Sequence, residues 1–310
     1  MELLKEGEIY KSLKYDFDKL FASPSRIHDD FRNIWTNITG KIDDVQITVE
    51  NARESIKNLV LYDALDGSRT TLTSKLFIEP KDDTPLFSIA LVHTLAALGA
   101  KSCIIMLHTS YNRERGKRES ERIFDIIESG GELINQYFIE NNIRCNCLCI
   151  NKNYELIDLL YKVERRTQGG SFNAYLLFDY DEKWVRKKDG QNIIDELPEI
   201  DVHVRHTKFN FSGGWIPDKM KKSAFLYSQN GTTYSNWESD ELVALVVMAL
   251  LAKKFNEGEG LSKVYSSDDE IQYRYMKREV DLFQKTVYLR EHPRKLFMLG
   301  SPIGTYRIYY

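Results

Sequence analysis

The sequence has little of what marks secreted, membrane-spanning or nucleic-acid-binding proteins. It contains only four cysteines, too few for a disulfide framework, and residues 1–8 lack the apolar core of a signal peptide. The longest apolar run, 242–252, is shorter than the roughly 20 residues that cross a bilayer and suits a buried helix. A formal net charge of −3 gives no reason to expect nucleic acid as a partner. These absences favour a protein of the reducing cytoplasm.

Three of the cysteines, Cys145, Cys147 and Cys149, occupy alternate positions of one apolar segment. Alternate residues of a strand share a face, so the three thiols are expected on one side of it. Zinc is one alternative for such a row, but no pair of Cys or His at ligand spacing accompanies it. A small buried face is the favoured interpretation.

Short apolar segments rich in β-forming residues alternate with helical segments between residues 58 and 205. The pattern predicts strands at 59–62, 102–107, 143–150, 174–180 and 200–205, and helices at 86–98, 123–138, 154–166 and, further on, 242–254. This is a βαβ pattern, so the predicted fold class is α/β with a central parallel sheet flanked by helices. Helix 86–98 is apolar nearly all round, which is typical of a central core helix or of the wall of an apolar cavity.

With 310 residues, the chain is longer than a single core usually supports. We expect a helical or loop extension at 1–56, with Phe31 and Trp35 as apolar anchors, an α/β domain at 57–260, and a C-terminal extension at 261–310. The last part is predicted to contain one amphipathic helix and a basic, aromatic end.

Polar and charged residues follow the predicted strands at the points where these strands end. The first strand is followed by Asp63, Asp66 and Arg69, the second by Asn112, Arg113 and Arg115, and the fifth by Arg205, with lysines further on. The carboxyl ends of parallel strands meet at one edge of the sheet, where ligands bind, so the three clusters are expected to converge. Carboxylates among several cations suit a magnesium-bound diphosphate, while each cluster alone also fits a tight turn or a solvated loop.

In the same order, these segments resemble the motifs of the cis-prenyltransferases, the undecaprenyl diphosphate synthase-like enzymes. The likeness runs from about residue 58 to residue 237, within the domain expected at 57–260. The family's strand-end aspartate before Gly-Asn-Gly-Arg is similar to Asp63, or its rival Asp66, before Gly-Ser-Arg69. Its Ser-Thr-Glu-Asn-Trp-x-Arg resembles 109–115, its Asn-Tyr strand end 179–180, its Asp-x-x-Ile-Arg-Thr 201–207, and its Arg-x-Ser-x-Phe-Leu-x-x-Gln 221–229.

The resemblance implies an undecaprenyl diphosphate synthase-like fold and a prenyltransferase. With Mg²⁺, the enzyme would condense isopentenyl diphosphate with an allylic prenyl diphosphate, or couple two isoprenyl diphosphates. Asp63 or Asp66 is implied to hold the metal, and these aspartates and Asn112 to act in catalysis. The residues implied to bind diphosphate are Arg69, Arg113, Arg115, Arg205, Lys221 and Ser223.

The resemblance also implies where a prenyl chain and a partner would bind. The apolar helices 86–98 and 123–140 would line the prenyl chain. The expected partners are isoprenyl diphosphates and a second copy of the chain in a homodimer, with peripheral membrane association also considered.

The sequence departs from the family pattern at several points. It has no histidine where the family has a Gly-His pair, near Lys81 and Asp82, and about ten residues are inserted between Arg205 and Lys221. The family's metal-binding glutamate falls at Tyr234, and the candidate substitutes are Glu238, Asp240 and Glu241. Two alternatives therefore stay open: a non-catalytic subunit that binds a catalytic partner or a lipid, and a terpene-cyclising variant of the fold.

Overall fold

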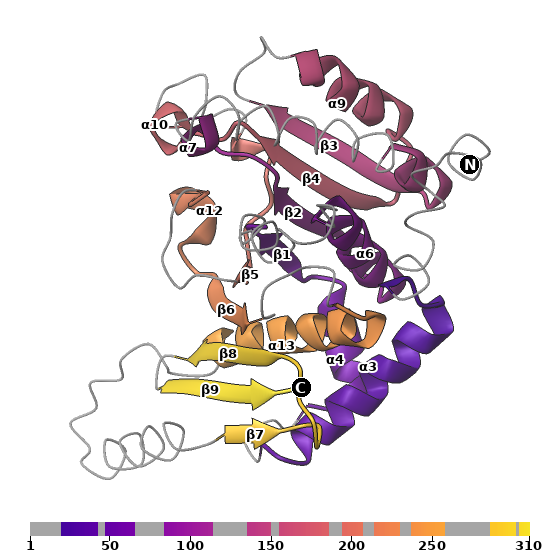
Figure 1. The fold of residues 1–310 in the computed structure, drawn as a ribbon, viewed down its shortest axis with the longest axis vertical. Helices are drawn as coiled ribbons and strands as arrows, with labels where there is room; N and C mark the ends of the chain where they lie inside the picture. Colours follow the sequence, from indigo (N-terminus) through magenta and orange to yellow (C-terminus); the bar gives the residue numbers. More distant parts are fainter. Residues whose placement is uncertain are drawn as a thin grey trace, which may run out of the picture.

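The computed structural model describes residues 20–42, 47–65, 84–113, 135–149, 155–185, 194–206, 214–229, 237–257, 286–301 and 304–310. The strands in this part of the chain form one sheet in the order β3-β4-β2-β1-β5-β6-β8-β9-β7 (Figure 1). Their bounds are β1 (Val60–Asp63), β2 (Ser102–Met106), β3 (Ile143–Cys149), β4 (Phe172–Phe178), β5 (Val202–Arg205), β6 (Ala224–Gln229), β7 (Thr286–Tyr288), β8 (Leu296–Ser301) and β9 (Gly304–Tyr309).

The strands from β3 to β6 in this order pair in parallel, each with its neighbour. The five strands predicted from the apolar segments are β1 to β5, so the predicted α/β class with a central parallel sheet is confirmed. Parallel neighbours need a crossover connection, and the predicted helices α6 and α9 lie between β1 and β2 and between β3 and β4. The described helices are α3 (Pro24–Thr39), α4 (Val49–Ile56), α6 (Thr84–Ala97), α7 (Ser110–Arg113), α9 (Glu155–Arg166), α10 (Glu182–Val185), α12 (Pro217–Met220) and α13 (Ser239–Glu257).

The C-terminal residues extend the same sheet. β8 pairs antiparallel with β6 and β9, and β7 pairs in parallel with β9. Sequence analysis left this end unassigned, although Tyr306 and Ile308 are buried while Arg307 between them is exposed, the alternation of a half-buried strand. Of the predicted C-terminal extension, residues 261–285 lie outside the described residues. The amphipathic helix predicted in the tail is therefore not tested there.

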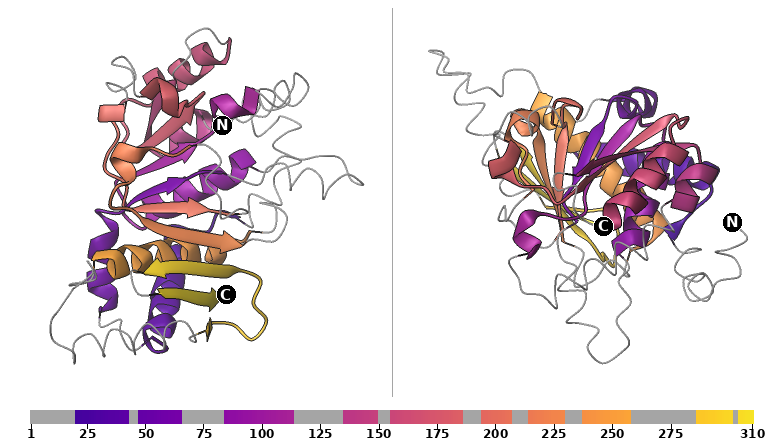
Figure 2. Two further views of the ribbon diagram at one scale, coloured as in Figure 1. Left: turned by 90° about the vertical axis from the view of Figure 1, so that its left-hand side faces the viewer. Right: turned by 90° about the horizontal axis from the view of Figure 1, so that it is seen from above.

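Helices cover both faces of the sheet. On one face, α6, α9 and α13 share a core with Leu61 and Val204 of the central strands. The opposite face, which includes Tyr62 and Met106, is covered by residues 194–200 and by α12. α3 and α4 pack on α13, so α13 lies between them and the sheet (Figures 1 and 2).

α13 is buried on all sides over much of its length. Its residues 242–252 have no exposed surface, which explains the longest apolar run of the sequence. α3 covers it with an apolar stripe in which the rings of Phe31 and Trp35 stack at a centroid distance of 6.0 Å. Trp35 Nε1 also donates to the carbonyl of Ile47 at 3.0 Å. The segment predicted as an extension at 1–56 is therefore helical in α3 and α4 and contributes to the main core.

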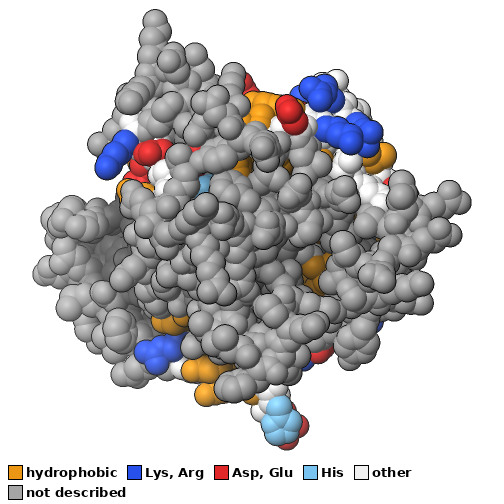
Figure 3. All heavy atoms as spheres, turned by 45° about the horizontal axis from the view of Figure 1, so that its top comes forward, with side chains coloured by type: hydrophobic (Ala, Val, Ile, Leu, Met, Phe, Trp, Pro, Cys, Tyr) orange, Lys and Arg blue, Asp and Glu red, His pale blue; other side chains and the backbone are white. Residues whose placement is uncertain are grey.

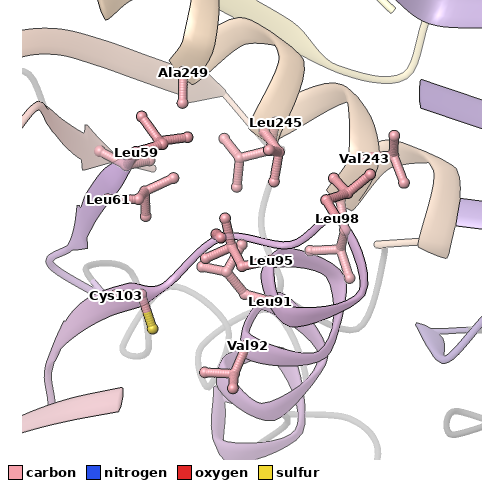
Figure 4. Packing of buried hydrophobic residues seen from close by; sticks show 14 of the residues in the cluster. Leu59, Leu61, Leu91, Val92, Leu95, Leu98, Cys103, Val243, Leu245 and Ala249 are labelled. Carbon is pink, nitrogen blue, oxygen red and sulfur yellow. The ribbon is translucent and has the colours of Figure 1, made fainter. Parts of the chain in front are cut away.

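The space between α6 and the sheet is filled by side chains. Leu91 and Leu95 of α6 project into the region between Leu61 of β1 and Leu245 of α13 (Figure 4). A side chain without exposed surface borders no space as wide as a water molecule. The α6 residues that are 0 % exposed include Phe87, Ala90, Leu91, Val92 and Leu95.

The α6 side chains from Leu86 to Val92 are therefore core residues, and these described residues line no open channel for a prenyl chain. This decides between the two interpretations of the apolar pattern of α6. Of the second segment expected to line such a chain, 123–140, the structure describes only residues 135–140, which are helical.

The described side chains on the face drawn in Figure 3 form small, separate groups of hydrophobic, basic and acidic residues. Large apolar side chains exposed in the described part include Tyr111, Ile139 and Tyr288. No helix in that part of the chain is both long enough and apolar enough to cross a bilayer.

Candidate functional site

Buried polar side chains gather at the carboxyl edge of the parallel strands. Asp63 ends β1, His108 and Asp179 follow β2 and β4, and Arg205 and His206 stand at the end of β5. Each of the five residues is at most 2 % exposed. Burying ionisable side chains costs free energy unless they are paired, so such a group marks a candidate site. In parallel sheets, ligands bind outside this edge.

The Asp63 carboxylate is held by a histidine and by its own turn. His206 Nε2 lies 3.2 Å from Oδ1 and 3.1 Å from Oδ2, and the Leu65 backbone N–H donates to Oδ1 at 2.8 Å. Leu65 has a left-handed backbone with φ of 43°, so the chain turns sharply after the strand. The other ring nitrogen, His206 Nδ1, lies 2.5 Å from Ser228 Oγ on β6.

Aromatic rings surround the imidazole of His206. Phe87 of α6 and Trp237, just before α13, meet it edge-on at centroid distances of 5.3 and 5.9 Å. These two rings also contact each other at 5.2 Å, and both are fully buried. Packing therefore restrains the ring that contacts Asp63.

A second histidine and aspartate meet between β2 and β4. His108 Nδ1 lies 3.5 Å from Asp179 Oδ1, and the His108 ring stacks on Phe178 at 4.9 Å. Asp179 has a left-handed φ of 54°, and the backbones of His108 and Tyr180 are joined by a hydrogen bond of 3.0 Å. His108, which follows β2 ahead of the cluster around Asn112, is 1 % exposed and is therefore not part of a solvated loop.

Asn112 lies in α7, directly after β2. Its Oδ1 accepts hydrogen bonds of 2.8 Å from both the backbone N–H and the hydroxyl of Thr109. This carbonyl therefore stabilises the turn that leaves the strand. The backbone of Arg113 is in the same helix, whereas Asp66, Arg69 and Arg115 lie outside the described residues.

The structure brings Asp63, Asn112 and Arg205 to one edge of the sheet, because β2, β1 and β5 are neighbours. It does not bring Asp63 and Arg205 to one face. Asp63 pairs with Val204, and successive residues of a strand point to opposite faces, so Arg205 faces away from Asp63.

Arg205 shares its face with two tyrosines that bind the backbone of residues 214–215. Tyr62 donates to the carbonyl of Gly214 at 2.5 Å, and Tyr180 donates to that of Trp215 at 2.7 Å. Burial raises the pKa of Tyr62 well above its usual value, and the nearby charge of Arg205 acts in the opposite direction. Gly214 has φ of +77°, and a Cβ there would lie 2.7 Å from the Tyr62 hydroxyl, so this close approach requires glycine.

Lys221 and Ser223 lie at the other end of the sheet, before β6 begins. Ala224 pairs with Val202, while Arg205 pairs with Tyr227. Ser223 therefore lies four residues before the level of Arg205, or about 13 Å along the strand. Lys221 Nζ is 3.2 Å from Asp218, and Ser223 Oγ donates to the Met220 carbonyl at 3.0 Å. The expected grouping of both residues with Arg205 is not observed.

The acidic residues at the start of α13 are engaged by cations of the 289–295 segment, which connects β7 to β8. Glu241 accepts from the Glu238 backbone N–H at 2.8 Å, as in a capping box, and lies 3.3 Å from Lys295 Nζ. The ion pairs in this group join Asp240 to Arg290, Glu238 to Arg294, and Glu241 to Arg294 and Lys295. These carboxylates therefore connect α13 to the sheet instead of facing a metal site.

The donors around Asp63 fit magnesium only when the substrate supplies further ligands. No group of three or more His, Cys, Asp and Glu side chains in the described ranges is placed to hold a metal. Asp63 uses three of its roughly four acceptor positions on His206 and Leu65, which leaves one on Oδ2. Magnesium is commonly bound through one or two carboxylates together with substrate phosphates and water.

His206 and Ser228 are site residues that sequence analysis missed. The signal for His206 was its place directly after Arg205 at a strand end. Ser228 gave no signal, because a serine within an apolar strand is ordinary.

No protein-family model and no curated protein match the chain. Among solved structures, it is similar to a probable undecaprenyl diphosphate synthase from Campylobacter jejuni, with a TM-score of 0.45 and 14 % identity over 62 % of this chain and 94 % of that one. It is also similar to lavandulyl diphosphate synthase from Lavandula x intermedia, solved in complex with dimethylallyl diphosphate, with a TM-score of 0.49 and 13 % identity over 64 % of this chain and 96 % of that one.

Proposed function

We propose that this protein is a magnesium-assisted prenyltransferase that binds isoprenyl diphosphates at the carboxyl edge of its sheet. The observation that supports this most is the buried, oriented carboxylate of Asp63 at the end of a central parallel strand, where ligands bind in such sheets. The motif resemblance between residues 58 and 237 suggests the reaction. The enzyme would condense isopentenyl diphosphate with an allylic prenyl diphosphate or couple two isoprenyl diphosphates.

In this reaction, the allylic carbon–oxygen bond breaks, diphosphate leaves, and a carbon–carbon bond forms to the double bond of the second substrate, which then loses a proton. Asp63 or Asp66 would hold magnesium, which neutralises charge on the leaving diphosphate. Asn112 has its Oδ1 occupied by Thr109, so it would contact diphosphate through its amide nitrogen. The cations proposed to bind diphosphate oxygens are Arg69, Arg113, Arg115 and Arg205.

A second candidate is a subunit of the same family that binds a catalytic partner or a lipid without turnover. Two observations favour it. The interior beside α6 is filled by side chains, which leaves no open channel there for a prenyl chain. Lys221 and Ser223 lie at the amino end of β6, away from Asp63.

The test incubates the protein with Mg²⁺, radiolabelled isopentenyl diphosphate and allylic acceptors of graded length. We expect a labelled prenyl diphosphate, and a loss of rate of about a hundredfold in Asp63→Ala and in Asp66→Ala, the order lost when one charge-stabilising group is removed. Glu54→Ala is the matched control, because this carboxylate is 70 % exposed on α4 and should leave the rate unchanged.

No product from any acceptor, together with co-purification of a second synthase, would contradict the proposal and favour the non-catalytic subunit. Cyclic or irregular products would instead favour a terpene-cyclising variant. The proposal includes a homodimer, for which light scattering should give twice the chain mass of 36.2 kDa.

A further inference from the structure

A chain of buried polar groups crosses three neighbouring strands at the carboxyl edge. It runs from Ser228 on β6 through His206 at the end of β5 to Asp63 on β1, with contacts of 2.5 Å and 3.1–3.2 Å. All three residues are 0 % exposed. The chain lies on the face that carries α6 and α13, where the neighbours Val204 and Leu226 are apolar.

Packing alone does not explain the imidazole. Phe87 and Trp237 enclose residue 206, so an apolar side chain there would be well packed without losing hydration. The histidine instead places a hydrogen-bond donor against both oxygens of a carboxylate. It has another buried partner in Ser228, whose hydroxyl can donate to Nδ1 and so keep the proton on Nε2.

These contacts restrain the Asp63 carboxylate. His206 Nε2 contacts both oxygens, and Leu65 N–H fixes Oδ1, so rotation of the carboxylate would break hydrogen bonds in a buried environment. The remaining acceptor position is on Oδ2, and because Asp63 is 0 % exposed, a metal would reach it only after the side chains that cover it move. A ligand carboxylate whose other positions are occupied by hydrogen bonds is pre-oriented for a single metal contact.

We infer that His206 is a positioning residue that, supported by Ser228, orients Asp63 to offer one Oδ2 position to a magnesium-bound diphosphate. The inference rests on the proposed function and adds to it the residue that sets the geometry of the carboxylate. His206 itself is assigned no contact with substrate.

The test measures binding of Mg²⁺ with inorganic diphosphate by calorimetry, which reads the site independently of turnover. In His206→Leu we expect binding at least about tenfold weaker, the lower end of what loss of an outer partner costs a metal site. In His206→Gln the amide Nε2 can donate where the imidazole Nε2 did, so we expect binding within about threefold of wild type. Ser228→Ala should weaken binding less than His206→Leu does.

His93→Leu serves as the matched control. His93 is a packed histidine on α6 that contacts the Ala22 carbonyl at 2.8 Å and the Tyr137 hydroxyl, away from the sheet edge. The His93→Leu substitution should lower the melting temperature, as we also expect of His206→Leu, but it should leave diphosphate binding unchanged.

Two results would overturn the inference alone: wild-type binding in a folded His206→Leu, or a His206→Gln that binds as weakly as His206→Leu. If His206→Leu fails to fold, His206→Gln and Ser228→Ala still test the inference. An equal loss of diphosphate binding in these two variants would indicate that packing, and not the hydrogen bond to Asp63, is what the histidine supplies. A wild-type protein that neither binds magnesium diphosphate nor transfers a prenyl group would overturn the proposed function itself.

Discussion

Replacing Lys295 with methionine would isolate the ion pair that joins the residue before β8 to α13. Lys295 Nζ lies 3.3 Å from Glu241 Oε2, and the two side chains are 2 % and 0 % exposed. Removing one partner of a buried pair costs about 3–5 kcal/mol, because the other charge stays buried. Arg294 Nε remains 3.5 Å from the other Glu241 oxygen, so we expect the lower end, about 3 kcal/mol.

Thermal unfolding followed by circular dichroism would measure this loss. An unfolding entropy of about 2.1 cal/mol/K per residue over 310 residues converts 3 kcal/mol to a fall in Tm of about 5 °C. In the Glu241→Gln background the substitution leaves no buried carboxylate behind, so it should cost at most about 1 kcal/mol, the value of an ordinary hydrogen bond. Lys57→Met is the control, because its ion pair with Glu54 is exposed and should be worth less than about 1 kcal/mol.

A Lys295→Met protein that loses no more stability than Lys57→Met would contradict the cost assigned to the buried charge of Glu241. An equal cost in the wild-type and Glu241→Gln backgrounds would also refute it. Lys295 Nζ lies 5.1 Å from the ring centroid of Trp237, which packs on His206. The ion pair therefore supports the wall of the candidate site as well as the C-terminal strands.

Two further predictions concern backbone geometry and acid stability. Gly214→Ala should lower the free energy of unfolding, measured with urea, by about 2–3 kcal/mol. The strain of a positive φ and a contact of 2.7 Å with the Tyr62 hydroxyl both contribute to this loss. Gly99 has φ of +86° and open space around it, so Gly99→Ala should lower the free energy of unfolding by only about 1 kcal/mol. Equal losses in the two variants would show that the contact with Tyr62 contributes nothing. Burial lowers the pKa of His93, so the unfolded state binds its proton more readily, and stability should fall as the pH drops below about 6.5. His93→Gln should flatten this dependence between pH 7 and pH 5, and parallel curves for the two proteins would contradict it.

The sequence predicted β1 to β5, and not their parallel neighbour β6, because those five strands carry a strong local signal. All five residues of β2 are buried, and its apolar run ends abruptly in polar residues, as in a strand covered on both faces. The C-terminal strands were missed because they contain aromatic, basic and small residues in short stretches. Their identity as strands depends on the pairing of β8 with β6 and of the C-terminal strands with one another, which no local pattern displays.

The candidate site was predicted by position and not by its contacts. Strand ends correctly placed Asp63 and Arg205 at one edge, because that needs only parallel strands. The opposite faces of these two residues follow from the register of β1 against β5. The contact between Asp63 and His206, residues 143 apart in sequence, depends on the same register, as does the position of Ser228. The displacement of Lys221 and Ser223 follows from the parallel pairing of β6 with β5, which starts that strand at the far end.

A crystal structure of the protein soaked with Mg²⁺ and inorganic diphosphate would locate both the metal and the diphosphate relative to Asp63. The account predicts diphosphate and magnesium density at the carboxyl edge of β1 and β2, with one metal contact to Asp63 Oδ2 while His206 stays on the carboxylate. Density at the amino end of β6, beside Lys221 and Ser223, or no density with the ligand in excess, would contradict it.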